Sequence, residues 1–170
     1  MKPKELALIS MFTSLTALGA QMTVPIGPVP ITLQVLFVLL SGLILGARLG
    51  FLSQALYMFL GLIGLPVFAH LGSGLATLYG PTGGYLMAFP LASYLSGLFT
   101  GRGKAFQLLG SLLAIGVIYL LGWARLSLIL GLAKAFYVGV LPFVGVDVTK
   151  AVVAVLVADA VREALPENRF

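Results

Sequence analysis

The most informative run of this chain reads Pro142-Phe-Val-Gly-Val-Asp147-Val-Thr-Lys150-Ala-Val-Val-Ala-Val-Leu-Val-Ala158, an apolar segment with one carboxylate and one ammonium group near its start. Asp147 and Lys150 are three residues apart, so on a helix their side chains lie on one face. A helix that begins after Pro142 and Gly145 places Asp147 in or next to the first turn, where a negative charge suits the helix dipole. Charges inside a membrane helix are costly and usually functional. The run therefore predicts either a ligand-binding pair or an ion pair that only caps the helix end.

The whole chain has the composition of a membrane protein. Hydrophobic residues make up 60% and charged residues 9% of its 170 residues, whereas a soluble domain carries roughly 25% charged residues. A chain of this length cannot hide so much apolar surface in its interior. The chain has no cysteine, which excludes thiolate catalysis, and its one histidine, His70, cannot form a metal site alone. We expect a single, all-α transmembrane domain over residues 1–170, surrounded by the lipid bilayer.

Apolar segments separated by turn residues predict six membrane-spanning helices. They cover about residues 6–22, 31–45, 49–63, 85–99, 105 to beyond 121, and 142–161, and residues 126–141 fit a short extra helix. A cluster of prolines excludes regular helix between residues 25 and 30. The glycine-rich segment 64–84 is expected to be a loop that is buried in protein or lines a cavity. Several segments are shorter than the roughly 20 residues of a full crossing, so we expect the helices to extend into the loops. A five-helix arrangement fits the charges less well.

Cationic residues divide unequally between the two ends of this arrangement. The richer end holds Lys2, Lys4, Arg48, Arg102, Lys104, Arg162 and Arg169. The other end keeps Arg125, Lys134 and Lys150. Because cytoplasmic loops carry the excess of positive charge, we expect a multi-pass protein of a prokaryotic cell membrane with both termini in the cytoplasm. Asp147, His70, the proline cluster and the glycine-rich loop then share the opposite side, where a ligand would bind.

Small residues follow one face of the first expected helix. Ser10, Ser14 and Ala17 recur at helical spacing, which lets another helix approach closely. That helix belongs either to a second protein or to this chain, and the residues alone favour neither.

The sequence contains no complete catalytic constellation. Asp147 and Asp159 are separated by about 18 Å along one helix, so they cannot share an aspartyl site. Asp159 and Arg162 fit a plain ion pair at the cytoplasmic helix end. No carboxylate lies near His70 in the sequence to orient it as a base, and a phosphate-binding loop is absent. We therefore expect no enzyme, and uphill transport would need ion coupling or another protein.

The candidate site combines Asp147 and Lys150 with tyrosines and a glycine-rich wall. The run Gly80-Pro-Thr-Gly83-Gly84-Tyr85 leads into a helix N-terminus, whose N–H groups can receive a carboxylate. The same run also fits an ordinary capping turn. These features suit a small, mostly apolar molecule with a carboxylate and polar N–H groups. They suit a bare ion or a nucleic acid poorly.

Four runs of this sequence resemble those of the BioY family. They are Pro28-Val-Pro-Ile-Thr-Leu-Gln34, Gly61-Leu-Ile-Gly-Leu-Pro66-Val, Gly80-Pro-Thr-Gly-Gly-Tyr85 and Asp147-Val-Thr-Lys150. BioY proteins are the biotin-specific substrate-binding (S) components of energy-coupling-factor (ECF) transporters. The resemblance, which covers nearly the whole chain, implies a six-helix S-component fold and high-affinity biotin binding from outside. It implies neither catalysis nor a cofactor.

The resemblance also implies partners and a set of site residues. The partners are an EcfT-type transmembrane coupling protein and two cytoplasmic EcfA-type ATPases, with Ser10, Ser14 and Ala17 facing the coupling protein. The candidate substrate-binding residues are Asp147, Lys150, Tyr85, Gly83, Gly84, Gln34 and His70. Leu86 stands where some members carry a basic residue, and Gly72 where some carry an asparagine. Part of the polar pocket is thus missing or replaced, with His70 and Arg125 as the candidate replacements.

Two other classes of function are also compatible with the sequence. An S component for another vitamin would share the fold but not these four runs. A stand-alone carrier coupled to protons or sodium would transport in liposomes with no partner and no ATP.

Overall fold

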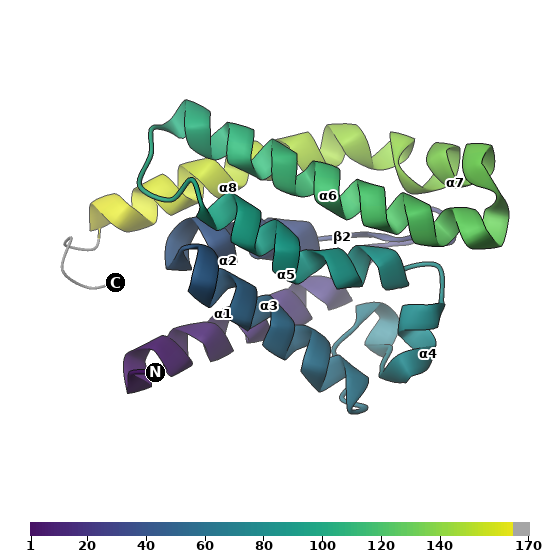
Figure 1. Cartoon of the computed structure of the whole chain (residues 1–170), viewed down its shortest axis with the longest axis horizontal. Helices are drawn as coiled ribbons and strands as arrows, with labels where there is room; N and C mark the ends of the chain where they lie inside the picture. Colours follow the sequence, from purple (N-terminus) through teal and green to yellow (C-terminus); the bar gives the residue numbers. More distant parts are fainter. Residues whose placement is uncertain (165–170) are drawn as a thin grey trace.

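The computed structural model describes residues 1–164 as a bundle whose long helices run roughly along the long axis of the molecule (Figure 1). The start of α1 and the end of α8 lie toward the same end of the bundle. The polar tail beyond residue 164, with Arg169, lies outside the described residues. The long helices are α1 (Pro3–Gln21), α2 (Gln34–Leu45), α3 (Ala47–Leu62), α5 (Gly83–Gly97), α6 (Lys104–Leu130) and α8 (Val144–Ala164).

The mostly helical fold confirms the expected class, and two stretches have the properties of membrane spans. Lys104–Leu130 and Leu132–Ala164 are long and apolar enough to cross a bilayer, and α2 and α3 are shorter apolar helices. The count of six crossings stays a prediction.

Small residues let the central helices approach closely. Helix α2 packs against α1, α3, α5 and α8. A Cβ atom at Gly42 of α2 would overlap the backbone oxygen of Ser93 in α5, so this crossing requires glycine. Close packing of this kind stabilises helices where lipid offers no hydrophobic driving force between them.

The connections contain more regular structure than expected. Helix α6 continues through Trp123 to Leu130, and the next residue, Gly131, has a φ of 83° that favours glycine. The extra helix expected over 126–141 is therefore shorter and starts later. The segment 64–84, expected to be a loop, holds two helical turns, and the proline cluster is framed by two paired antiparallel strands. These pieces are β1 (Thr23–Val24), β2 (Ile31–Thr32), the 3-10 turn η1 (Ala69–Leu71), α4 (Gly74–Tyr79), α7 (Leu132–Gly139) and the 3-10 turn η2 (Leu141–Phe143).

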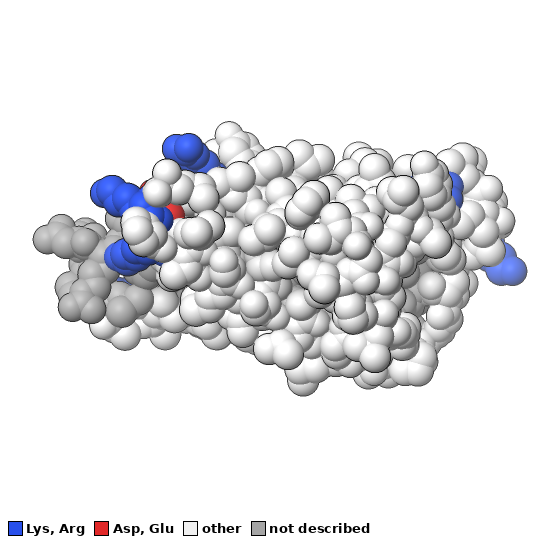
Figure 2. Space-filling model, turned by 90° about the horizontal axis from the view of Figure 1, so that it is seen from below, with Lys and Arg blue, Asp and Glu red and all other residues white. Residues whose placement is uncertain are grey.

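Charged side chains gather at the two ends of the face seen in Figure 2, with an uncharged belt between them. Asp159 pairs with Lys104 at 2.9 Å, so its expected pairing with Arg162 is wrong. The Arg162 guanidinium instead donates to the Leu43 carbonyl oxygen at 2.7 Å, because α8 brings it to the C-terminal end of α2. This separation of charge from the apolar middle is the pattern that a bilayer requires.

Candidate functional site

A cavity of about 270 Å³ lies among α2, α5, α6 and α8 and is covered by two loops. Its size is close to the lower bound of roughly 300 Å³ for pockets that hold small molecules. The helices and η2 line it with Gln34, Val35, Tyr85, Leu86, Phe89, Ile118, Tyr119, Phe143, Asp147 and Lys150. Strand β2, the loops and α4 add Gly27, Pro28, Val29, Pro30, Thr32, Phe68, Ala69, His70, Thr77, Pro81 and Thr82.

The charged centre of the cavity is the pair of Asp147 and Lys150. The Lys150 ammonium lies 2.6 Å from Asp147 Oδ1, and the two residues are only 6% and 2% exposed. Tyr119 of α6 donates its hydroxyl to Asp147 Oδ2 at 2.8 Å. Helix α8 supplies both charges from its first turns, so their spacing of three residues brings them together as expected. The pair is buried in the interior and is not an ion pair at the water interface.

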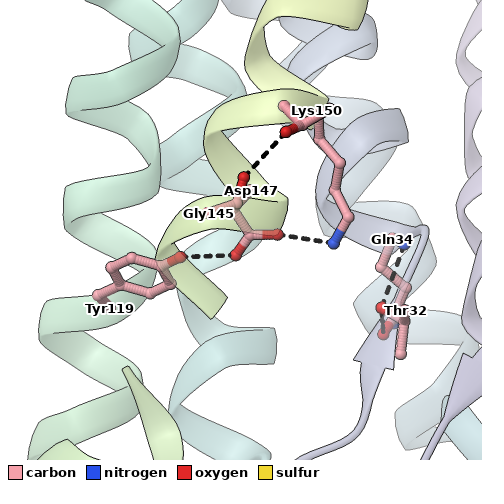
Figure 3. A network of polar contacts seen from close by, with 7 residues as sticks. Thr32, Gln34, Tyr119, Gly145, Asp147 and Lys150 are labelled. Carbon is pink, nitrogen blue, oxygen red and sulfur yellow. Dashed lines mark hydrogen bonds and ion pairs between the residues drawn. The ribbon is translucent and has the colours of Figure 1, made fainter. Parts of the chain in front are cut away.

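A second polar chain lies across the cavity at the start of α2. Gln34 donates to the Tyr57 hydroxyl at 2.7 Å and accepts from the Thr32 hydroxyl at 3.0 Å. Tyr57 in turn donates to the Val67 carbonyl oxygen at 3.0 Å. Figure 3 shows the Lys150 ammonium extending from α8 toward Gln34 and Thr32. The cavity therefore places an anion, a cation and an amide within one small space.

These groups keep unused hydrogen-bonding capacity. An ammonium group has three N–H donors and a carboxylate can accept about four hydrogen bonds. Within the described contacts Lys150 spends one donor on Asp147, and each Asp147 oxygen accepts one bond. A ligand that offers both N–H donors and an acceptor can be recognised here without breaking the ion pair.

Tyr85 lines the cavity with its ring, while its hydroxyl is already engaged. It donates to the Gly139 carbonyl oxygen at 2.7 Å. Gly83 and Gly84, which we expected to contact the substrate, are not among the described lining residues. A Cβ atom at Gly84 would overlap the Leu121 carbonyl oxygen, so this glycine lets α5 pack on α6. The N–H of Gly83 donates to the Gly80 carbonyl oxygen at 3.3 Å, which fits the capping-turn interpretation.

His70 borders the cavity from an unusual turn. His70 and Leu71 have φ angles of 56° and 57°, in the left-handed region that non-glycine residues rarely adopt. Each such residue costs roughly 1–3 kcal/mol. Gln21, the last residue of α1, bonds both ends of the turn, at the Phe68 carbonyl oxygen (2.9 Å) and the Leu71 N–H (3.1 Å). Hydrogen bonds of about 1 kcal/mol each offset part of that cost.

Arg125 lies outside this cavity. Its guanidinium donates to the Tyr79 carbonyl oxygen, and it lines a second, more open pocket with Leu75, Leu78, Tyr79 and Met87. Leu86, at the position where some relatives carry a basic residue, is 5% exposed and adds an apolar surface to the cavity. Of the two candidate replacements, only His70 borders the cavity within the described part of the chain.

The small residues of α1 do not pack inside this chain as a set. Ser10 and Ser14 are exposed and Ala17 is half-buried. The Ser14 hydroxyl bonds within its own helix, to the Ser10 carbonyl oxygen at 2.9 Å. Packing within the chain is therefore excluded for the two serines, and their face of α1 is free for a neighbour.

Sequence patterns did not point to several polar residues of this site, chiefly Tyr119, Thr32 and Tyr57. Tyr119 carried a usable signal, because a tyrosine within a long apolar helix needs a partner for its hydroxyl. Thr32 and Tyr57 become visible only once the chain folds, since their partners lie on other elements. Gln21 gave no signal, because it joins segments that are 47 and 50 residues apart.

Comparisons with known proteins point to one family. The model of the BioY family matches residues 1–167. The "Probable biotin transporter BioY" of Pyrococcus horikoshii is 53% identical, over 94% of this chain and 96% of the relative. The "Biotin transporter BioY" of Thermotoga maritima is 43% identical, over 91% and 94%. Both relatives are named as transporters, in agreement with the expectation of no catalysis.

A solved structure has the same fold. It is described as the S-component for biotin from an ECF-type ABC transporter, and it superposes with a TM-score of 0.87 at 28% identity, covering 96% of this chain and 95% of its own. The shared fold and the match over nearly the full length together show that this chain belongs to the BioY family.

Proposed function

We propose that this protein is the biotin-binding S component of an ECF-type importer. The observation that carries the proposal is the buried pair of Asp147 and Lys150, which is bonded to Tyr119 and faces a small cavity. A buried ion pair adds little net stability once desolvation is counted. Its place in a cavity wall therefore fits a role in ligand binding better than a role in folding.

Biotin matches the unused capacity of the cavity. Its ureido ring presents N–H donors and one acceptor, and its remaining atoms are mostly apolar. Asp147 accepts a ureido N–H, while Lys150 binds either the ureido oxygen or the valerate carboxylate. Gln34 and His70 are the further polar contacts that we propose, with Tyr85 as an apolar wall. Gly83 and Gly84 act through the packing of that wall.

The direct test is calorimetry with purified, folded protein, first freed of any co-purified biotin that mass spectrometry detects. Biotin is expected to bind tightly, whereas riboflavin and thiamine are not. Binding of another vitamin in place of biotin would assign the protein to a different S-component specificity. Biotin transport into liposomes with no partner and no ATP would assign it to the stand-alone carriers.

We also propose the orientation and the partners of the membrane protein. Both termini and the turns at Arg48 and at 102–104 face the cytoplasm, because the cationic residues concentrate there. The cavity then opens to the outside. A cysteine placed at Gly103 should resist a membrane-impermeant reagent added to intact cells, and ready labelling would reverse the orientation.

Energy for import would come from an EcfT-type coupling protein and EcfA-type ATPases, since this chain lacks a phosphate-binding loop. The exposed Ser10 and Ser14, with Ala17, form the proposed contact with the coupling protein. Ser14→Leu should block close approach sterically and weaken co-purification with that partner. Its biotin affinity should match wild type, and loss of both properties together would mean that the larger side chain disturbs the fold of this chain and not one contact with the partner.

A further inference from the structure

The turn that covers one side of the cavity is held by a side chain that does not line the cavity. Gln21 donates from Nε2 to the Phe68 carbonyl oxygen at 2.9 Å and accepts the Leu71 N–H at Oε1 at 3.1 Å. The two bonds bracket Ala69 and His70, which border the cavity. We propose that Gln21 is a positioning residue that holds this turn closed and thereby sets the rate of ligand release, an inference that rests on the proposed binding of biotin.

The two ends of the turn are held differently: packing and backbone hydrogen bonds fix its base, whereas a side chain from α1 holds its tip. At its base the Phe68 ring is 1% exposed and packs edge-on against Tyr57, with 5.6 Å between ring centroids. The Phe68 N–H donates to the Gly72 carbonyl oxygen at 3.0 Å, and the Gly72 N–H donates to the Ala69 carbonyl oxygen at 3.1 Å. These backbone bonds close the turn on itself. Gln21 is the described side chain that ties its tip to a helix.

Backbone strain and exposure to water favour opening of the tip. His70 and Leu71 both adopt left-handed backbone angles, which disfavour residues with a side chain. Both residues and Gln21 are exposed, so water competes for the bonds that hold them. The turn is thus strained, and the hydrogen bonds that hold it are exposed to water. Both properties suit a segment that must let a ligand pass.

The same end of α1 also anchors the proline loop, a second segment that lines the cavity. The Leu33 N–H donates to the Gly19 carbonyl oxygen at 3.2 Å, and β1, just after α1, pairs with β2. The proline loop between these strands also lines the cavity. The end of α1 therefore holds both loops, the 68–71 turn through the Gln21 side chain and the proline loop through backbone hydrogen bonds.

The test is the rate of biotin release from the purified full-length chain, followed by chase with excess unlabelled biotin. Gln21→Met keeps the length of the side chain and removes both bonds. We expect release to be about tenfold faster, because two hydrogen bonds of ordinary strength are lost, with a smaller change in the association rate. Gln21→Glu keeps the acceptor for the Leu71 N–H and should fall between. Leu18→Ala, an exposed change one turn earlier on α1, should match wild type.

Hydrogen exchange without biotin gives an independent readout. Amides of residues 67–72 should exchange faster in Gln21→Met than in wild type or Leu18→Ala. Unchanged exchange would overturn the tie. Wild-type release from Gln21→Met, even with a lower melting temperature, would reduce Gln21 to a structural role while leaving biotin binding intact. Failure of the wild-type chain to bind biotin would defeat the proposed function, and the exchange data would still judge whether Gln21 holds the turn.

Discussion

Two ion pairs of this protein join the same kinds of groups in opposite surroundings. Lys104 and Asp159 lie 2.9 Å apart with side chains 62% and 25% exposed, at the start of α6 and near the end of α8. Lys150 and Asp147 lie 2.6 Å apart with side chains 8% and 3% exposed, near the start of α8. One helix thus carries both carboxylates, one beside water and one inside the protein.

The difference lies in what each pair costs and what it can do. Exposed pairs are screened by water and contribute little to stability. A buried pair is costly to desolvate, and removal of one partner strands the other charge. The exposed pair needs no function to explain it. The buried pair fits a protein that uses two oriented charges to bind a ligand.

The largest effect is expected from Lys150→Ala. This change strands the Asp147 carboxylate and removes a donor that we assign to biotin. A charge-assisted hydrogen bond is worth roughly 1.5–3 kcal/mol, and each 1.4 kcal/mol is about tenfold in affinity. Calorimetry should show biotin binding weaker by about tenfold to a few hundredfold. An unchanged dissociation constant with a lower melting temperature would make the pair purely structural.

A smaller effect is expected from Tyr119→Phe. The change removes the hydroxyl that donates to Asp147 Oδ2 at 2.8 Å and leaves both charges in place. Because Asp147 keeps Lys150, we expect biotin binding to weaken by about threefold to tenfold. Tyr137→Phe, at a tyrosine that is 65% exposed, is the matched control and should bind as wild type. Equal affinities in both variants would remove Tyr119 from the site.

The smallest effect is expected from Lys104→Ala, which breaks the exposed pair. Asp159 then stays in contact with water, so no charge is stranded. Biotin affinity should equal that of wild type, and the melting temperature should hardly change. A loss of affinity comparable to that of Lys150→Ala would show that the two ends of α8 are coupled, and the contrast drawn here would fail.

Local sequence patterns predicted the features that depend on nearby residues, namely the faces of helices and the turns between them. Three-residue spacing placed Asp147 and Lys150 on one face, and the turn residues near Gly46 and Gly101 separated helices correctly. The sequence left the C-terminal end of α6 undefined past residue 121, and the helix continues through Trp123 and Arg125 to Leu130. A polar side chain does not end a helix unless the backbone also turns.

Contacts between segments that are distant in the chain could not be predicted from the sequence. Tyr119 reaches Asp147 across 28 residues, and Gln21 reaches Leu71 across 50. Gly84 shows the reverse case, in which a local pattern suggested a function: its glycine-rich run indicated part of the wall of the ligand site. In the fold the lack of a side chain serves the packing of α5 on α6. Glycine permits close approach of any neighbour, and the sequence does not say which neighbour approaches.

Titration of folded Asp147→Asn with biotin decides whether the buried pair binds the ligand. This variant keeps the shape of the side chain and removes its charge. We predict binding weaker by about tenfold to a few hundredfold. In a cycle with Lys150→Ala, the double variant should lose less than the product of the single losses, since both share one cause. Wild-type affinity in folded Asp147→Asn would show that the charge of Asp147 plays no part in binding biotin.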